Sequence, residues 1–368
     1  MPCTETPNTI VITRVLRLIT LIFIPFTFGL ISLFLGKDIN WDLRNYHYYN
    51  AYAFLENRLD FDIAPAQLQT FINPLADLPF YWLTKHFHPW VAGFVFGYVH
   101  GFNLSLVFII FWKIFNLINK WKTFLIGICL VTISGAAPGF ISELGNTMHD
   151  NLTSLFVLFA VFLLINALDM INNGRNSKGW AYLGAGGLIM GMGVGIKPSV
   201  TIFAMSTALI FIVFQTSWTN RLKSLFIYAT TGIIGGISSA GFWWLEMWRR
   251  FGNPFFPFYN HIFKSPYFTT TQINWSPYLP RHLWEYFIWP IIFTFDSVRT
   301  NQFYFFDIRF ALIYILFLIW PIAVFLRKSR LIQPVPANNE SIFGTESGNF
   351  LLLFYLLSYI LWLKESAT

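Results

Sequence analysis

Long apolar runs separated by short basic turns constrain the fold of this chain more than any other feature of its sequence. A run of about 20 apolar residues crosses the hydrocarbon core of a membrane as an α-helix. Hydrophobic residues make up 55% of the chain and charged residues only 11%, a balance outside that of soluble globular domains. We therefore predict an all-α, polytopic transmembrane helical bundle. About nine spans are expected by length, at residues 15–36, 89–112, 123–141, 152–171, 180–196, 198–216, 224–247, 308–326 and 349–363.

The positions of the basic residues predict which side of the membrane each loop faces. Basic clusters fall in the turns on the side of Arg14 and Arg17, and the positive-inside rule makes that side cytoplasmic. The clusters are Lys113, Lys120 and Lys122; Arg175 and Lys178; Arg221 and Lys223; and Arg327, Lys328 and Arg330. The N-terminus is then cytoplasmic, and the outer loops cover about 37–88, 142–151 and 248–307. Because the net charge of +7 arises in such turns, we expect no nucleic-acid partner.

The first outer loop combines aromatic, acidic and basic residues. Its stretch "NYHYYNAYAFLENRL" has aromatic and apolar residues at helical spacing, which predicts an amphipathic helix lying in the membrane interface with tyrosines at headgroup depth. The stretch "INPLADLPFYWL" predicts a second such helix. We interpret Asp60, Asp62 and Asp77 in this loop as solvated interfacial residues.

Four groups on the predicted outer face are candidates for chemistry. They are Asp42 with its neighbour Asp38, Asp150, Lys197, and the pair Arg249 and Arg250. A carboxylate at the membrane rim can act as a general base or hold a cation, and basic side chains can hold a phosphate.

Each candidate also has a structural alternative. Lys197 ends the Gly-rich stretch "GLIMGMGVGIK" and precedes a proline, where a lysine in hydrocarbon requires a partner, but it could also snorkel to the headgroups. Arg249 and Arg250 could contact anionic lipid. No His/Asp spacing in the sequence fixes a metal site on His47 and His149, so the metal is left unknown.

The order and sidedness of these motifs resemble the GT-C superfamily of integral-membrane glycosyltransferases, in particular its glycosyltransferase 87 and mannosyltransferase-like members. In "WDLRNYHYYNAYAF", Asp42 opens the first outer loop and Tyr46 follows four residues later, as in the family. Asp150 in "NTMHDNLTSLFVLF" begins a later span, and Lys197 ends a Gly-rich one. "GNPFFPFYN" is similar to a turn of the family. The resemblance covers most of residues 15–325.

The resemblance implies a reaction and a set of site residues. The donor would be a sugar on a polyprenyl phosphate embedded in membrane lipid, and transfer would occur on the outer face of the cell (inner) membrane. Asp42 would be the base that deprotonates the acceptor hydroxyl, and Asp150 would position the acceptor or a divalent cation. The charge on the leaving phosphate would be stabilised by basic groups, namely Lys197, Arg249 and Arg250, with Arg44 and His47 as further candidates. The acceptor and the sugar are not identified.

Two departures from the family pattern stand out. Leu43 occupies a place that is acidic in many relatives, so Asp38 is either its substitute or the true base. The chain stops at "LLLFYLLSYILWLKESAT", whereas family members continue, so we expect one GT-C-like domain over 1–368 without the family's C-terminal part. The alternatives are a transporter or flippase of lipid-linked sugars, which would favour inverted repeats that the sequence does not display, and a non-catalytic membrane assembly protein.

Overall fold

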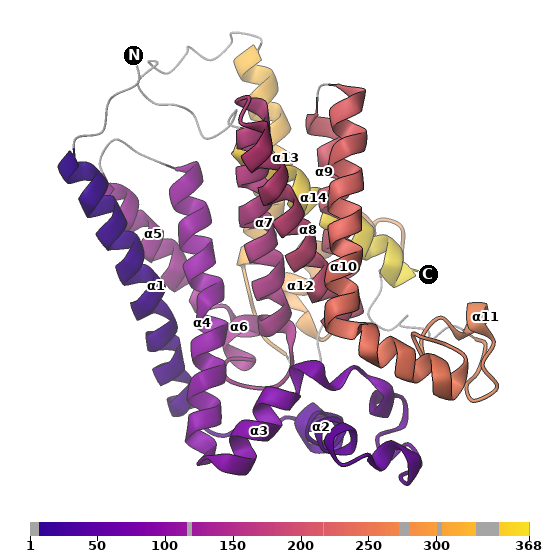
Figure 1. Cartoon of the computed structure of the whole chain (residues 1–368). Coiled ribbons are helices and arrows are strands. Elements are labelled where there is room, and N and C mark those ends of the chain that lie inside the picture. Colours follow the sequence, from indigo (N-terminus) through magenta and orange to yellow (C-terminus); the bar gives the residue numbers. More distant parts are fainter. Residues whose placement is uncertain are drawn as a thin grey trace. The chain divides into compact units, whose positions relative to one another are not determined.

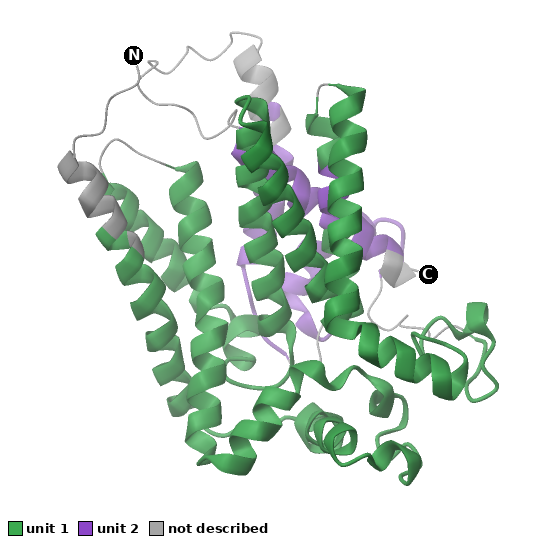
Figure 2. Ribbon diagram, in the orientation of Figure 1, with its two compact units in different colours: residues 1–204, 211–272 green, residues 205–210, 273–368 purple. Residues whose placement is uncertain are grey.

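The structure is a computed structural model, and it describes residues 7–115, 120–215, 217–271, 280–299, 304–328 and 346–367. Every regular element in these ranges is a helix, which confirms the all-α prediction. The chain divides into two compact units (Figure 2). Unit 1 comprises residues 1–204 and 211–272, and unit 2 comprises residues 205–210 and 273–368.

Six helices in the described part of the chain are long and apolar enough to cross a membrane, so the expectation of nine spans was wrong. The protein is therefore a helical protein with multiple candidate membrane spans. The six segments are Leu18–Leu35, Pro89–Ile114, Asp150–Asn172, Asn176–Ile196, Trp218–Phe251 and Glu346–Lys364.

The other three expected spans, 123–141, 198–216 and 308–326, lie on helices that are not among these six. The first is α5 (Lys120–Gly135), whose 16 residues rise about 24 Å, less than the hydrocarbon thickness. The second is Pro198–Phe214, which includes α9 (Thr201–Phe214), and the third is the apolar segment Arg309–Ile319 of α13 (Arg309–Lys328). In the first case hydropathy overestimated the helix because it does not register that the helix ends at Gly135.

The long helices of unit 1 run side by side (Figure 1). α4 (Pro89–Ile114) packs against α1 (Pro7–Leu35), α5 and α7 (Asp150–Asn172), and α8 (Asn176–Ile196) packs against both α7 and α10 (Trp218–Phe251). Glycine lets α8 and α10 approach closely: a Cβ atom on Gly191 would lie 1.9 Å from the carbonyl oxygen of Gly232. Small residues in this role are typical of helix contacts inside membranes.

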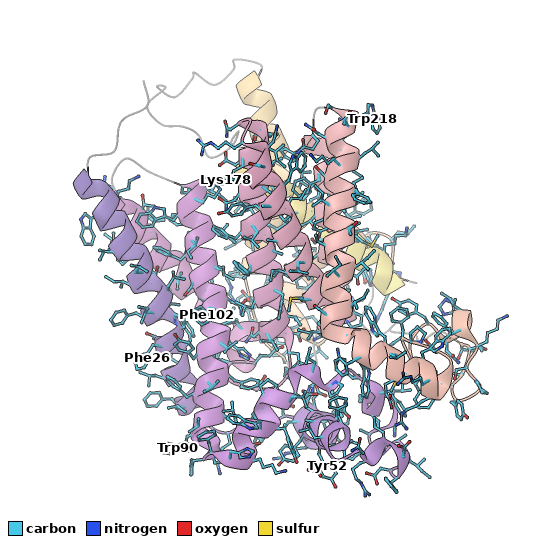
Figure 3. The ribbon with its side chains drawn as sticks, viewed as in Figure 1. Phe26, Tyr52, Trp90, Phe102, Lys178 and Trp218 are labelled. Atoms are coloured by element: carbon cyan, nitrogen blue, oxygen red, sulfur yellow. The ribbon has the colours of Figure 1, made fainter. Side chains whose placement is uncertain are left out.

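The outward faces of these helices carry large apolar side chains. Phe23 and Phe26 of α1, for example, are 61% and 47% exposed. Contact of such side chains with water is unfavourable, and contact with lipid avoids it. Figure 3 shows Tyr52 and Trp90 toward one end of the unit 1 helices and Lys178 and Trp218 toward the other. Aromatic residues near both ends are typical of membrane–water interfaces.

The loop of residues 37–88 folds into short helices at one end of the unit 1 bundle (Figure 1). A π-helical turn at Leu43–His47 leads into α2 (Tyr48–Leu55), and α3 (Leu78–His86) follows after three short 3-10 turns. The helical predictions for both stretches of this loop are confirmed. The short helix α6 (Pro138–Ser142) lies at the same end and leads toward α7.

Unit 2 contains α12 (Glu285–Phe295), α13 and α14 (Glu346–Ala367). α12 packs against α13, and Arg299 binds the buried Glu285 at the start of α12 with an N–O distance of 2.9 Å. Ser358 of α14 bonds to Ser206 at 3.0 Å. The candidate residues discussed below belong to unit 1.

Candidate functional site

Asp150 and Lys197 are brought together by the antiparallel packing of α7 and α8. Asp150 is the first residue of α7, where a negative charge is favoured by the helix dipole. Lys197 follows the last residue of α8 in an extended conformation, before the 3-10 turn Pro198–Val200. The Lys197 ammonium donates to an Asp150 carboxylate oxygen. The predicted helix break and the partner that this lysine requires are both present.

Glu143, which the sequence analysis did not single out, belongs to the same group. Its side chain is partly buried in the turn before α7. Burial raises the pKa of Glu143 to about 8, the negative charge of Asp150 adds to the rise, and Lys197 opposes it. Glu143 therefore carries a proton over much of the neutral range.

Asp42 lies next to Tyr46 at the π-helical turn. Such turns are rare and often occur at functional sites. Burial raises the pKa of the Tyr46 hydroxyl well above its usual range, and Asp42, which bonds to this hydroxyl, adds to the rise, as do the charges of Asp77 and Asp150. Three carboxylates thus raise the pKa of one tyrosine. Asp42 and Asp150 are therefore both close enough to Tyr46 to affect its ionisation.

His47, Asp77 and His149 form a buried cluster, with side chains 3%, 1% and 8% exposed. Asp77 Oδ1 lies 2.7 Å from His47 Nδ1 and 2.8 Å from His149 Nε2. The interpretation of Asp77 as a solvated residue was therefore wrong, because the loop folds back and places the N-cap of α3 beneath the two imidazoles. Burial lowers the pKa of His149 despite the opposing charge of Asp77, which favours its neutral form.

Asp38, a candidate base, makes contacts that anchor the loop. Its carboxylate accepts hydrogen bonds from the Thr147 backbone N–H and hydroxyl, each at 2.9 Å, and from the Asn40 side chain at 2.6 Å. Asp38 also lines a cavity together with Lys37 and Trp90. Asp42, Asp150 and Lys197 are not among the residues that line that cavity.

The predicted phosphate-binding arginines lie in different settings. Arg250 binds Asp60 and is 2.6 Å from Glu246, so its guanidinium is already paired. Arg44 and Arg249 are exposed. His47, grouped with them by sequence, faces Asp77 inside the buried cluster.

The loop of residues 37–88 is held beside the end of α8 by hydrogen bonds to its middle. The Asn73 amide donates to the backbone oxygens of Gly195 at 3.1 Å and Ser239 at 3.0 Å. The Trp243 indole donates to the Phe71 oxygen at 2.9 Å. These bonds tie the loop to α8 and α10 close to Lys197.

The chain matches no protein-family model, no curated protein and no solved structure. Its class is therefore defined by its own fold, a helical protein with six candidate membrane spans.

Proposed function

We propose that the chain is a membrane glycosyltransferase of the GT-C type, which moves a sugar from a polyprenyl phosphate to an acceptor hydroxyl on the outer face of the membrane. The observation that carries this proposal is the group of Asp42, Tyr46, Asp150 and Lys197 at one end of the unit 1 helices. It joins a partly exposed carboxylate to a cation near the expected membrane surface, the minimum that such a transfer requires.

Each group has a role in the proposed reaction. Asp42 takes the proton of the acceptor hydroxyl while the hydroxyl oxygen attacks the anomeric carbon. The bond from that carbon to the phosphate oxygen breaks, and its electron pair goes to the phosphate. Lys197 stabilises the resulting negative charge, while Asp150 orients the lysine and positions the acceptor or a divalent cation. Lys197 is about one-third exposed, so a phosphate can approach it.

The surroundings suit a lipid-linked donor. The apolar outer faces of the helices are compatible with a polyprenyl tail, whose phosphate would lie at headgroup depth. Arg44 and Arg249 are exposed and available to a phosphate, whereas Arg250 would first have to leave Asp60. In this proposal the N-terminus is cytoplasmic and the site faces outward, as the positive-inside rule predicts.

Transfer from a panel of polyprenyl-phosphate sugars, measured in membranes that contain the chain, tests this proposal. Asp42→Asn should reduce transfer by about 100-fold or more, because an amide cannot accept the proton. Asp62→Asn is the matched control, since Asp62 lies in the same loop but bonds to Arg58 and Tyr49. Equal transfer by Asp42→Asn and the wild type would remove Asp42 as the base. No transfer from any donor would contradict the reaction class.

A further inference from the structure

The buried cluster of His47, Asp77 and His149 contains polar atoms that its surroundings do not satisfy. Both ring nitrogens of His47, both carboxylate oxygens of Asp77 and Nε2 of His149 lack a well-aligned hydrogen-bond partner among the described residues. The short distances to Asp77 are therefore close contacts without the alignment of good hydrogen bonds. Leaving five such atoms buried without partners costs free energy, unless another group completes the site.

The spacing of the three side chains fits a metal ion as that group. One ligand atom from each lies within 4.8 Å of the other two. Ligands bonded to an ion at 2.0–2.1 Å are about 2.9–3.4 Å apart for octahedral to tetrahedral angles. The separations of 2.7 and 2.8 Å from Asp77 Oδ1 to the two imidazole nitrogens would have to widen by a few tenths of an ångström. The third pair, one ligand atom from each histidine, lies within 4.8 Å and would have to close to the same range.

The chemistry of the ligands selects the kind of ion. Two imidazoles and one carboxylate suit divalent transition metals, whereas Mg²⁺ and Ca²⁺ prefer oxygen ligands alone. Zn²⁺ binds readily to two histidines and a carboxylate, and it leaves a fourth position free.

We propose that His47, Asp77 and His149 bind one divalent transition-metal ion, with Zn²⁺ as the ion that this ligand set favours. The ion would join three segments distant in sequence: the π-helical turn, the N-cap of α3 and the residue that precedes α7. It would thereby fix Tyr46 and Asp150, the chain neighbours of the two histidines. The inference does not rest on the proposed glycosyl transfer, because the ligand atoms and their burial carry it alone.

A metal-free cluster is the competing explanation. In that case Asp77 would accept an N–H bond from each imidazole, and the cluster would only lock the loop to α7. The two explanations differ in metal content and in their response to chelators, so they are separable without any assay of transfer.

Metal analysis of the full chain, purified in detergent through an affinity tag free of histidine, tests the proposal directly. The wild type should hold about one zinc per chain after equilibration with Zn²⁺ and buffer exchange. Chelation should lower the melting temperature, and Zn²⁺ should restore it. His149→Gln should bind zinc at least about tenfold more weakly. His86→Gln, which changes an exposed histidine, is the matched control and should bind as the wild type does.

Cobalt provides a second measurement that does not depend on a variant folding. Co²⁺ added to the chelated wild type should produce visible absorption bands of a nitrogen- and oxygen-ligated ion, and Zn²⁺ should abolish them. Less than about a tenth of an ion per chain, with no change in melting temperature on adding Zn²⁺, would overturn the proposal. Equal zinc binding by His149→Gln and His86→Gln would also overturn it, since the metal would then lie elsewhere.

Discussion

Lys197 and Asp150 form an ion pair that joins the end of α8 to the start of α7. The two side chains are 33% and 54% exposed, so water screens much of their attraction. An ion pair in this setting contributes little to stability. If Lys197 has a functional role, a Lys197 mutant should therefore lose activity while losing little stability.

Replacing Lys197 by methionine should reduce transfer far more than stability. We expect a loss of about 0 to 1 kcal/mol in unfolding free energy, and about 100-fold or more in transfer if the ammonium stabilises the leaving phosphate. Thermal melting in detergent and transfer in membranes are the two measurements.

The matched control is Lys113→Met on α4, which removes an ion pair with Asp169 at the other end of α7. Lys113 binds Asp169 at 3.0 Å and is likewise only partly exposed. This variant should lose a similar amount of stability and keep its transfer. If both variants lost transfer equally, the loss would come from the lower stability of the bundle. It would then not show that Lys197 stabilises the leaving phosphate.

The pKa of Glu143 predicts how stability changes with pH. Burial raises this pKa from 4.5 to about 8 in the folded chain, so between these values the folded state binds more protons than the unfolded state. The stabilising contribution is then fully present below pH 4.5 and is lost as pH rises through about 8. Melting temperatures measured across this window should therefore fall as pH rises.

Glu143→Gln should flatten that fall, because glutamine stays neutral at every pH. The control Glu56→Gln changes an exposed glutamate and should leave the slope as in the wild type. A slope that is the same in Glu143→Gln as in the wild type would contradict the assignment of the pH effect to this carboxyl.

The helical segments followed from the sequence, because apolar run length and aromatic spacing are local properties. Residues whose roles depend on burial did not follow. Asp77 looks like an ordinary loop aspartate until the loop folds back over it. The pKa of Glu143 is raised by its burial in the fold, and the charge of Asp150 adds to the rise. Lys197 is intermediate: its need for a partner was evident, but the identity of that partner required the packing of α7 on α8.

The length of the spans shows the same limit. Residues 123–141 are apolar throughout much of their length, yet α5 ends at Gly135, shortly before Pro138 begins α6. The choice of the candidate base meets the same limit. Asp38 and Asp42 are both aspartates of one loop, and only their contacts in the fold distinguish them.

Gly191→Ala tests the close contact of α8 with α10. The added methyl would lie 1.9 Å from the backbone oxygen of Gly232, so the helices must move apart. We expect a loss of about 2 kcal/mol in stability, measured as a lower melting temperature. Gly184→Ala on the same helix is the control, since its methyl would meet Thr231 at an ordinary 3.5 Å and should cost nothing. Equal melting of the two variants would show that the helices do not approach as described.

Asp38→Asn distinguishes an anchoring aspartate from a catalytic one. Asp38 accepts two hydrogen bonds from Thr147, and the amide of asparagine weakens both. Because the side chain is only partly buried, we expect a loss of about 1 kcal/mol, with a moderate decrease in transfer as the loop loosens. Thr147→Val should have a similar effect, and the double variant should lose less than the sum of the two.

Asp42→Asn should instead lose transfer without loss of melting temperature. If Asp38→Asn abolishes transfer at an unchanged melting temperature, the base is Asp38 and the role proposed for Asp42 is wrong.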